Sequence, residues 1–587
     1  TLFNMGSISK VYVAASIMLL VDEGKVALDR PVTTYLPEFK MADARFKDIT
    51  VRMLLNHSSG LPGTEGSNSF GFHYNNKLQQ ETLSTLVRAR LKHAPGAMSP
   101  YCNDGFTLAE MIVERVSGQK YPEFLKENIF TPLGLKNTGV SVGEIKGKLA
   151  AAYYDPKTGK MHPLEALSVL GAGGLSTTPS ELCRFADTFS AANKLFKKDS
   201  LAEMKKAQPN PFSDKLRRPA FSFGLGWDLT GLPRYDAAGI QVLGKTGGTG
   251  DYSSMLFTVP DKRISVAVIA AGPHSSAMII ALDILDAVLV EKKLIAPEEK
   301  PVPVPVAARK LPQAETAFSG YYGNGSDLFQ VEFDQDKDQV VLSRFDGKEK
   351  TTLGTYVYNQ GYYYRDNQKD SSAYFTALAG QDYFVNCIDS LKIDAISAQK
   401  IVPIAKAPRL KIDLDGKQWL RRNAYPDEGF IVQGAYLTTS HLYQELPGYV
   451  EFMGIKKIET PEFAGMPFDA IRDQTELTLF DRNGATWAWV SDMLYSPVES
   501  AAALKAGKNS VTIGSEGYNE WLAAKEGLVL SFTKPKNGRV IVFSADGTTT
   551  YDSALDTGET YAAKGSYIEL GGYAHDVLSV EARVPAQ

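Results

Sequence analysis

Ser7 and Lys10 stand three residues apart near the start of the chain. On a helix such a pair lies on one face, so the lysine amine can take the proton of the serine hydroxyl. This pairing activates a serine as a nucleophile that forms a covalent acyl intermediate. The S-x-x-K pattern is short, however, and it recurs in three other places, which begin at Ser117, Ser397 and Ser531.

The surrounding sequence separates the first copy from the others. After Lys10 the chain is apolar almost without interruption to Val21, which predicts a helix buried inside a domain. A serine at its first turn would lie beside a desolvated lysine of lowered pKa and at the positive end of the helix dipole. Ser117 follows a finished helix, and Ser397 and Ser531 lie in β-type surroundings, so we interpret these three serines as solvent-exposed surface.

Two further motifs contain side chains that could assist a serine. The segment SPYCNDGF contains Tyr101 and Asn103, and VLGKTGGTGDYSS contains Lys245, Thr246 and Gly247. Tyr101 follows a predicted turn and precedes a predicted helix, which would hold it in a fixed place. Lys245 follows the strand-like segment IQVL and leads into another strand-like segment. Both motifs therefore have the rigid surroundings that a catalytic group needs.

These two motifs also have copies elsewhere. Y-x-N recurs at Tyr74 and Tyr322, and K-T-G recurs at Lys157. Tyr74 lies in a polar stretch, and Tyr322 lies in the β-rich half of the chain. Lys157 follows Asp155-Pro156 and precedes a glycine, which predicts a turn in solvent. We therefore interpret all three copies as structural.

In this order, the three motifs resemble those of the serine β-lactamase and penicillin-binding protein superfamily, in its class C-like branch. That branch includes D-alanyl-D-alanine carboxypeptidases, D-aminopeptidases and related esterases. The segments LLNHSSGLPG, NIFTPLGLKNT, GAGGLSTTPSELCRFADTF and FGLGWDL also resemble this group. The resemblance extends from about Thr1 to Leu294, and Tyr101-Cys102-Asn103 occupies the place of the S-D-N motif of the class A branch.

The resemblance implies a role for each of these groups. Ser7 attacks a carbonyl group, the pair of Lys10 and Tyr101 takes its proton, and Asn103 orients Lys10 and the substrate amide. The backbone N–H groups of Ser7 and Gly248 form the oxyanion hole, in which one donor can contribute roughly 3 kcal/mol. A glycine at position 248 leaves the substrate's path along the strand free.

Lys245 has two roles that the sequence does not separate. An ordinary tyrosine, with a pKa of about 10, is only about 0.1% ionised at neutral pH, and its use as a base costs about 4 kcal/mol. We expect the Lys10 and Lys245 ammonium groups to lower the pKa of Tyr101. The resemblance also implies that Lys245, with Thr246 and Gly247, binds the substrate and holds a substrate carboxylate. The alternative is that Lys245 tunes Tyr101 alone.

The composition of the 587 residues is typical of a soluble globular protein, with 44% apolar residues, 22% charged residues and a net charge of -4. No basic run indicates a nucleic-acid partner, and no apolar run is long enough to span a membrane. The three cysteines are scattered, and the seven histidines lack metal-ligand spacing. We therefore expect no metal and no cofactor.

Changes in composition divide the chain into five parts. Residues 1–298 are expected to form the β-lactamase-like domain, and the proline-rich segment 299–312 an extended linker. Residues 313–405 are expected to form a β-barrel of lipocalin-like type, residues 406–500 a further β-rich domain, and residues 501–587 a β-sandwich. The predicted fold class is α/β, an antiparallel sheet flanked by helices, followed by all-β domains.

Two hairpins are predicted locally. The runs SSMLFTVP and ISVAVIAAG, joined at Asp261 to Arg263, predict a hairpin followed by a helix in SAMIIALDILDAVLVEKKL. The segment GLVLSFTKPKNGRVIVFSADG predicts the second. Only six residues precede Ser7, where members of this family usually carry several dozen. We therefore expect either that an upstream segment is missing and the central sheet lacks an edge, or that another segment fills the gap.

Three functions remain open on the sequence. The first is a D-stereospecific serine peptidase or amidase, because β-rich additions are more typical of those enzymes than of β-lactamases. The second is a β-lactamase or esterase, and the third is a non-catalytic penicillin-binding or scaffold protein. The intact set of site residues argues against the third. The expected partner is a small peptide, amide or β-lactam whose length the β-rich domains restrict, and family habit places the protein outside the cytoplasm.

Overall fold

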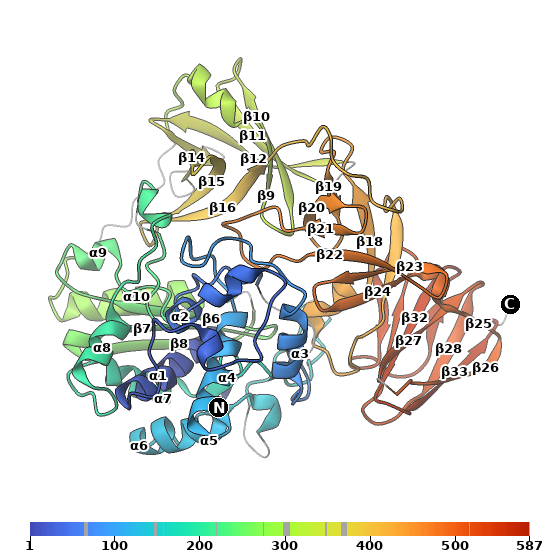
Figure 1. The fold of residues 1–587 in the computed structure, drawn as a ribbon, viewed down its shortest axis with the longest axis horizontal. Coiled ribbons are helices and arrows are strands. Elements are labelled where there is room, and N and C mark those ends of the chain that lie inside the picture. Colours follow the sequence, from blue (N-terminus) through green and yellow to red (C-terminus); the bar gives the residue numbers. More distant parts are fainter. Residues whose placement is uncertain are drawn as a thin grey trace.

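The computed structural model consists of a mixed α and β unit, two β-barrels and a two-sheet unit, arranged in chain order (Figure 1). No helix in the described ranges is long and apolar enough to cross a membrane. The structure describes residues 1–63, 69–145, 150–156, 158–218, 220–273, 275–297, 306–346, 349–365, 372–515 and 517–585.

The N-terminal unit is built on an antiparallel sheet of β6 (Leu243–Gly248), β7 (Tyr252–Val259) and β8 (Ile264–Ala271). The first predicted hairpin is confirmed as β7 and β8, and its turn places Arg263 in the left-handed region at φ 53°. The predicted helix follows as α10 (Ala277–Glu291).

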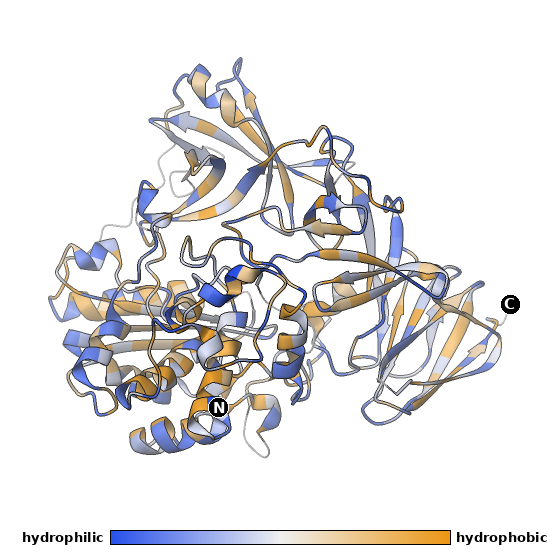
Figure 2. Cartoon of the chain, viewed as in Figure 1, coloured by the Kyte–Doolittle hydropathy of each residue, from blue (hydrophilic) through white to orange (hydrophobic). Residues whose placement is uncertain are grey.

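The two faces of this sheet carry different helices because successive side chains of a strand point to opposite sides. Met255 and Phe257 of β7 share one apolar cluster with Leu285 of α10. Leu256, between them in the sequence, belongs to the cluster around α1 (Ser9–Asp22). Figure 2 shows apolar residues concentrated on the strands and the helices beside them. The sheet therefore lies between α10 and the helices that carry the first motif.

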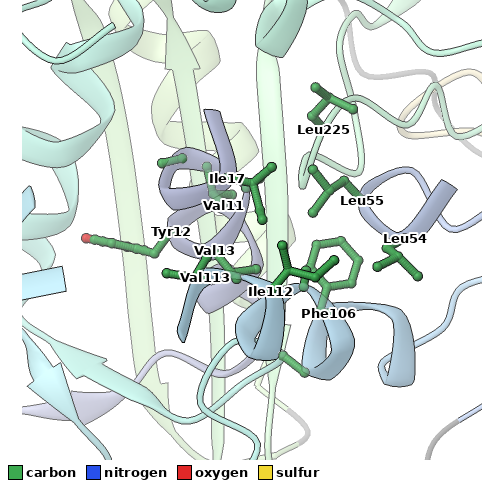
Figure 3. Close-up of a cluster of buried hydrophobic side chains, with 14 of the residues drawn as sticks. Val11, Tyr12, Val13, Ile17, Leu54, Leu55, Phe106, Ile112, Val113 and Leu225 are labelled. Carbon is green, nitrogen blue, oxygen red and sulfur yellow. The ribbon is translucent and has the colours of Figure 1, made fainter. Parts of the chain in front are cut away.

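α1 is buried on all sides, as its apolar sequence predicts. Its Val11, Val13 and Ile17 lie against α4 (Asp104–Ser117), in the cluster drawn in Figure 3. Because α4 begins directly after Asn103, this packing also fixes the second motif beside the first.

A small second sheet anchors the residues before Ser7. In it, β1 (Phe3–Asn4) pairs with β5 (Leu175–Thr177), which pairs with β3 (Gly139–Val140) on its other side. The N–H of Met5 continues the pairing by donating to the Leu175 carbonyl at 3.0 Å. This unit also contains further helices and two strands, β2 (Phe70–Gly71) and β4 (Ala166–Leu167), that pair as a separate two-stranded sheet. The helices are α2 (Val51–Leu55), α3 (Leu78–Leu86), α5 (Tyr121–Leu125), α6 (Thr131–Leu133), α7 (Pro179–Ala186), α8 (Lys198–Lys205) and α9 (Pro233–Asp236).

The next part of the chain forms a closed antiparallel barrel of eight strands, as the alternating sequence predicts. Its strands are β9 (Gly320–Gly323), β10 (Leu328–Asp334), β11 (Gln339–Phe345), β12 (Lys350–Asn359), β13 (Tyr362–Arg365), β14 (Ser372–Leu378), β15 (Gln381–Ile388) and β16 (Ile393–Ile401). Leu391 and Ile393 pack into the same cluster as α10, so this first barrel is attached to the N-terminal unit through apolar contacts. The first half of the predicted linker, up to Pro305, lies outside the described residues.

A second closed eight-stranded barrel follows. Its strands are β17 (Lys417–Arg421), β18 (Leu437–Leu442), β19 (Tyr449–Glu451), β20 (Ile455–Thr460), β21 (Phe463–Gly465), β22 (Leu477–Arg482), β23 (Ala485–Val490) and β24 (Met493–Pro497). Its loops reach both neighbours, because Asp469 N–H donates to Gln399 Oε1 of the first barrel and Gln474 N–H donates to the Pro62 carbonyl, each at 3.0 Å.

The last part packs two sheets face to face around one apolar cluster. The five-stranded sheet contains β25 (Ala502–Leu504), β27 (Tyr518–Ala524), β32 (Tyr567–Gly572), β29 (Arg539–Phe543) and β30 (Thr549–Asp552). The four-stranded sheet contains β26 (Gly507–Thr512), β33 (Val577–Arg583), β28 (Leu528–Thr533) and β31 (Thr560–Ala562).

The second predicted hairpin is wrong. Its two segments are strands, but β28 pairs with β31 and β33, whereas β29 pairs with β30 and β32. The connection that contains Pro535 crosses from one sheet to the other instead of turning back in the same sheet. Turn-forming residues between two apolar runs indicate a reversal of the chain, but they do not say which strands will pair.

Candidate active site

Ser7 lies in a single 3-10 turn, Gly6–Ile8, directly before α1. The chain passes so close to the end of β6 that only glycines fit there. A Cβ on Gly6, which has φ 52°, would lie 2.7 Å from the nitrogen of Gly248, and a Cβ on Gly247 would lie 2.1 Å from the Met5 carbonyl oxygen. This close approach places the serine beside the strand that carries Lys-Thr-Gly.

The Lys10 side chain is fully buried beneath Ser7. Its Nζ lies 3.2 Å from Ser7 Oγ, 2.6 Å from Asn103 Oδ1 and 2.5 Å from the Ala172 carbonyl oxygen. Burial, and then the charge of Lys245, lowers the pKa of Lys10 well below its ordinary value, as predicted. A neutral amine has two N–H groups and one lone pair, so the two carbonyl oxygens can accept both protons while the lone pair faces the serine.

Tyr101 does not have the lowered pKa that the sequence predicts. Burial raises the pKa of Tyr101, and the Asp228 carboxylate adds to that effect. The Lys245 ammonium, whose Nζ lies 3.2 Å from the Tyr101 hydroxyl, and a hydrogen bond with Ser7 act in the opposite direction but do not outweigh burial. The phenol is therefore protonated near neutral pH.

Lys245 lies inside β6 rather than beyond it, and its side chain is 0% exposed. Its Nζ donates to Asp228 Oδ1 at 2.8 Å, to the Tyr101 hydroxyl and to the Thr246 carbonyl. Burial alone would lower the pKa of Lys245, but Asp228 and Tyr101 together raise it. The ammonium is thus charged and already supplied with three acceptors.

Asp228 also orients the strand. Its Oδ2 accepts from the backbone N–H of Thr246 at 3.0 Å and from the Thr246 hydroxyl at 2.7 Å. Because alternate N–H groups of a strand point the same way, the N–H of Gly248 points away from β7. A Cβ on Gly248 would meet no atom within 4 Å, so this position opens onto free space.

Two residues of the site have no role in the sequence-based predictions. One is Asp228, the carboxylate that compensates Lys245. The other is His57, a buried residue at φ 65° whose ring stacks on Tyr101 at 4.2 Å and whose Nδ1 accepts from the Cys102 N–H at 3.0 Å. Both lie in segments that carry the family resemblance, FGLGWDL and LLNHSSGLPG, but no spacing links either one to its partner.

An open cleft of about 890 Å³ lies in front of these groups. Three of the four units contribute to its walls. The N-terminal unit supplies Ser7, Tyr101, Asn103, Phe223, Thr246 and Gly248, the first barrel supplies Asn324, Ser326 and residues 394–397, and the second barrel supplies Ile431 and residues 470–473.

One copy of the S-x-x-K pattern also borders this cleft. Ser397, which we interpreted as solvent-exposed surface, is half-buried and lines the open cleft from β16. Its partner Lys400 instead donates to Asp382 Oδ2 at 3.1 Å and to the Ala317 carbonyl. Residues three apart on a strand point to opposite faces, so this pair cannot act together.

The other copies that the structure describes lie apart from the cleft. Ser117 ends α4, and Ser531 lies in β28. Tyr322 is buried in the first barrel, and Tyr74 is exposed. Lys157 lies outside the described residues. Within the part of the chain that the structure describes, no group of three or more His, Cys, Asp or Glu side chains could hold a metal ion.

The fold and the three motifs define a class. An antiparallel sheet covered by helices, with S-x-x-K on a buried helix and K-T-G on a strand, is the arrangement of the β-lactamases and penicillin-binding proteins. The sequence of residues 1–289 matches the Beta-lactamase family, and this part of the chain belongs to it.

Known relatives match about half of the chain. Penicillin-binding protein 4 of Amycolatopsis lactamdurans is 27% identical over 329 residues, which cover 52% of this chain and 83% of that protein. The D-alanyl-D-alanine-carboxypeptidase/endopeptidase AmpH of Escherichia coli is 25% identical over 276 residues, 45% of this chain and 70% of that protein. The solved D-amino acid amidase of Ochrobactrum anthropi is 26% identical with a TM-score of 0.40, over 49% of this chain and 92% of that one.

Proposed function

We propose that the protein is a serine hydrolase that cleaves amide bonds through an acyl-enzyme on Ser7, and that it acts as a D-stereospecific peptidase or amidase. The arrangement of Lys10 supports this proposal most strongly. Its Nζ lies 3.2 Å from Ser7 Oγ, and two carbonyl oxygens accept its N–H groups. A buried amine held in this way is a base rather than an ion-pair partner.

In the first step, the Ser7 hydroxyl proton passes to the Lys10 lone pair while Oγ bonds to the substrate carbonyl carbon. The negative charge that develops on the carbonyl oxygen is stabilised by the backbone N–H groups of Ser7 and Gly248. Each such donor contributes about 3 kcal/mol to the stability of the transition state. Asn103 holds Lys10 in place and is available to the substrate amide.

In the second step, the carbon–nitrogen bond breaks, and the leaving nitrogen takes the phenol proton of Tyr101. The Lys245 ammonium, 3.2 Å from that hydroxyl, stabilises the phenolate as it forms. Lys10 then passes its proton to the Tyr101 phenolate, which restores the phenol. Water hydrolyses the acyl-enzyme by the same groups in reverse order. In this scheme Lys245 tunes Tyr101, which is the second of the two roles open on the sequence.

Mass spectrometry after incubation with a penicillin tests the nucleophile. We expect an adduct of the antibiotic's mass on Ser7 and no adduct in Ser7→Ala. Hydrolysis assays with D- and L-amino-acid amides, a D-Ala-D-Ala peptide and a chromogenic cephalosporin then test the substrate class, and we expect turnover of the D-configured amides. Turnover of the cephalosporin alone would instead make the protein a β-lactamase. Stable acylation without turnover would make it a penicillin-binding protein without hydrolase activity.

The domain boundaries at residues 298, 312, 405 and 500, and a location outside the cytoplasm, remain proposals that accompany this function. The location rests on the family resemblance, and cell fractionation with an antibody against the protein tests it. Recovery of the protein with cytoplasmic markers would contradict it.

A further inference from the structure

Three basic side chains surround the Tyr101 ring at almost the same distance. The Nζ atoms of Lys10 and Lys245 lie 4.9 and 5.0 Å from the ring centre, and the guanidinium carbon of Arg472 lies 4.8 Å from it. The two lysines belong to the family motifs. Arg472 comes from the second barrel, in the loop of residues 466–476 between β21 and β22. A residue from outside the β-lactamase-like part thus contributes to the candidate active site.

The loop is held firmly in this position. Gln474 Nε2 donates to the carbonyls of Phe468 and Ile471, which closes the loop on itself, and its backbone N–H donates to the Pro62 carbonyl at 3.0 Å. Asp473 has φ 50°, in the left-handed region that aspartate enters more readily than most non-glycine residues. The hydrogen bonds of Gln474 therefore fix the loop against the N-terminal unit.

The N-terminal unit accommodates this loop closely. A Cβ on Gly63 would lie 2.5 Å from the Cα of Asp473, so the two backbones touch without room for a side chain. Together with the bond from Gln474 to Pro62, this contact aims Arg472 at the cleft rather than at bulk solvent.

Arg472 is the single cationic side chain among the described residues that line the cleft. Its Nε donates to Asp473 Oδ2, and its two terminal nitrogens have no partner among the described residues. Its side chain is 51% exposed. A guanidinium can donate two parallel hydrogen bonds from its terminal nitrogens to one carboxylate. Lys245, by contrast, is fully buried and has three acceptors already.

We propose that Arg472 binds the carboxylate of the substrate's C-terminal residue, the residue that leaves when the amide bond is cleaved. The substrates are then peptides that end in a free carboxylate directly after the scissile bond. The Arg472 guanidinium lies over the Tyr101 ring, and Tyr101 is hydrogen-bonded to Ser7. One residue spans about 3.8 Å, so a carboxylate one residue beyond the scissile bond would lie near the guanidinium. The inference rests on the proposed function, and it selects carboxypeptidase-like over amidase-like substrates.

The test compares one peptide in two forms, acyl-D-Ala-D-Ala with a free carboxylate and the same peptide as its C-terminal amide. In the wild type we expect a higher kcat/KM for the carboxylate form. In Arg472→Ala the ratio of the two kcat/KM values should fall by on the order of 10- to 100-fold, the usual effect of losing a charge-assisted, two-point contact. Arg472→Lys should recover only part of the ratio, because an ammonium lacks the planar fork.

Arg482→Ala is the matched control, because Arg482 is an exposed arginine of the same barrel that also stacks on an aromatic ring, that of Trp487. The ratio of kcat/KM for the two peptide forms in Arg482→Ala should equal that of the wild type. An equal loss on both substrate forms in Arg472→Ala would overturn the inference, since it would mean that Arg472 positions Tyr101. An unchanged ratio would overturn it as well.

A substrate without a carboxylate separates this inference from the proposed function. Acetylation of Ser7 by p-nitrophenyl acetate, read as a mass increase, reports on the nucleophile alone. If Ser7 is acetylated but Arg472→Ala leaves the ratio of kcat/KM for the carboxylate and amide forms unchanged, then only the proposed role of Arg472 is wrong. Failure of Ser7 to react with either the ester or a penicillin would remove the proposed function and the inference with it.

Discussion

Lys10 and Lys245 are buried to the same extent, yet their pKa values shift in opposite directions. Burial favours the neutral form of both amines. Lys245 gains the Asp228 carboxylate at 2.8 Å, whereas Lys10 has only the neutral oxygens of Asn103 and Ala172 within 3 Å. The site therefore contains one lysine suited to accept a proton and one that is a permanent cation.

This difference predicts the pH dependence of the reaction. Below the pKa of Lys10 the ammonium cannot accept the Ser7 proton, so kcat/KM should fall as the pH decreases through that value, which lies well below 10.5. Above the raised pKa of Tyr101 the phenol cannot donate, so kcat/KM should fall again at alkaline pH. The measurement is kcat/KM of an amide substrate as a function of pH.

Variants assign the two limbs of that profile. Lys10→Arg should lose on the order of 10²- to 10⁴-fold in kcat/KM, because a guanidinium is never a base in proteins. Tyr101→Phe should lose the alkaline limb. An acid limb near the ordinary pKa of lysine, or an alkaline limb that persists in Tyr101→Phe, would contradict the assignment of these roles.

At the scale of elements, the segment of residues 169–174 connects Lys10, the proposed base, to the buried part of α4. Its Ala172 carbonyl accepts from Lys10, and its Gly171 N–H donates to Glu110 Oε2 at 2.7 Å. Glu110 lies two turns inside α4 and is almost fully buried, so burial raises its pKa to about 7. The position of Lys10 therefore depends on Glu110, a carboxylic acid with a pKa of about 7.

Glu110→Gln should flatten the pH dependence of stability. The folded-state pKa of Glu110 is raised from 4.5 to about 7. Its contribution to stability is thus fully present below about pH 4.5 and is lost as the pH rises to about 7, a change of about 3 kcal/mol. Urea unfolding of wild type and variant across this range measures the difference.

The control for this prediction is Glu123→Gln, which removes an exposed glutamate of α5. Its free energy of unfolding should follow that of the wild type at each pH. If Glu110→Gln keeps the full wild-type slope between pH 4.5 and 7, then Glu110 is ionised in the folded protein and the proposed linkage is wrong.

At the scale of the whole molecule, the cleft is a joint product of three units. The N-terminal unit supplies the reacting groups, and the two barrels form the opposite wall. Figure 1 shows both barrels lying along the same side of this unit. We expect the wall of such a cleft to limit the length of a substrate rather than its reactivity.

Ser326→Trp tests this limit in the intact chain. Ser326 is an exposed residue of the first barrel that lines the cleft, so a larger side chain there enters free space. We expect kcat/KM for tetrapeptides to fall by about tenfold, or ~1.4 kcal/mol, relative to dipeptides, because crowding costs are of that order. Thr351→Trp, on an exposed position of the same barrel away from the cleft, should leave the ratio unchanged. An equal effect of both variants would contradict a length limit.

Much of the site could be predicted because its parts are local. Ser7 and Lys10 are three residues apart on one helix, and an apolar sequence around them ensures that the helix is buried. Tyr101 and Lys245 lie far apart in the sequence. The order of their motifs along the chain resembles that of the family, and this resemblance predicts that both residues belong to one site. The raised pKa of Tyr101 could not be predicted in the same way, because it depends on burial and on Asp228, a residue that no spacing connects to it.

The same limit applies to the fold. Alternating residues and turns predict strands, and the first hairpin and first barrel formed as expected. The strands β28 and β29 formed as well, but they joined different sheets. Ser397 was placed on the surface, yet packing of the barrel against the N-terminal unit brought it to the cleft.

The sequence by itself determined the strands, the buried helix and the residues able to act on a carbonyl group, because these follow from side-chain periodicity and from spacing within one element. Only the tertiary structure decided which lysine remains charged and which strands pair. It also decided that Arg472, from the second barrel, lies over the Tyr101 ring and lines the same cleft as Ser7. The charge state of a buried lysine and the pairing of strands depend on distances between segments far apart in the chain. Those distances are set only once the units have packed together.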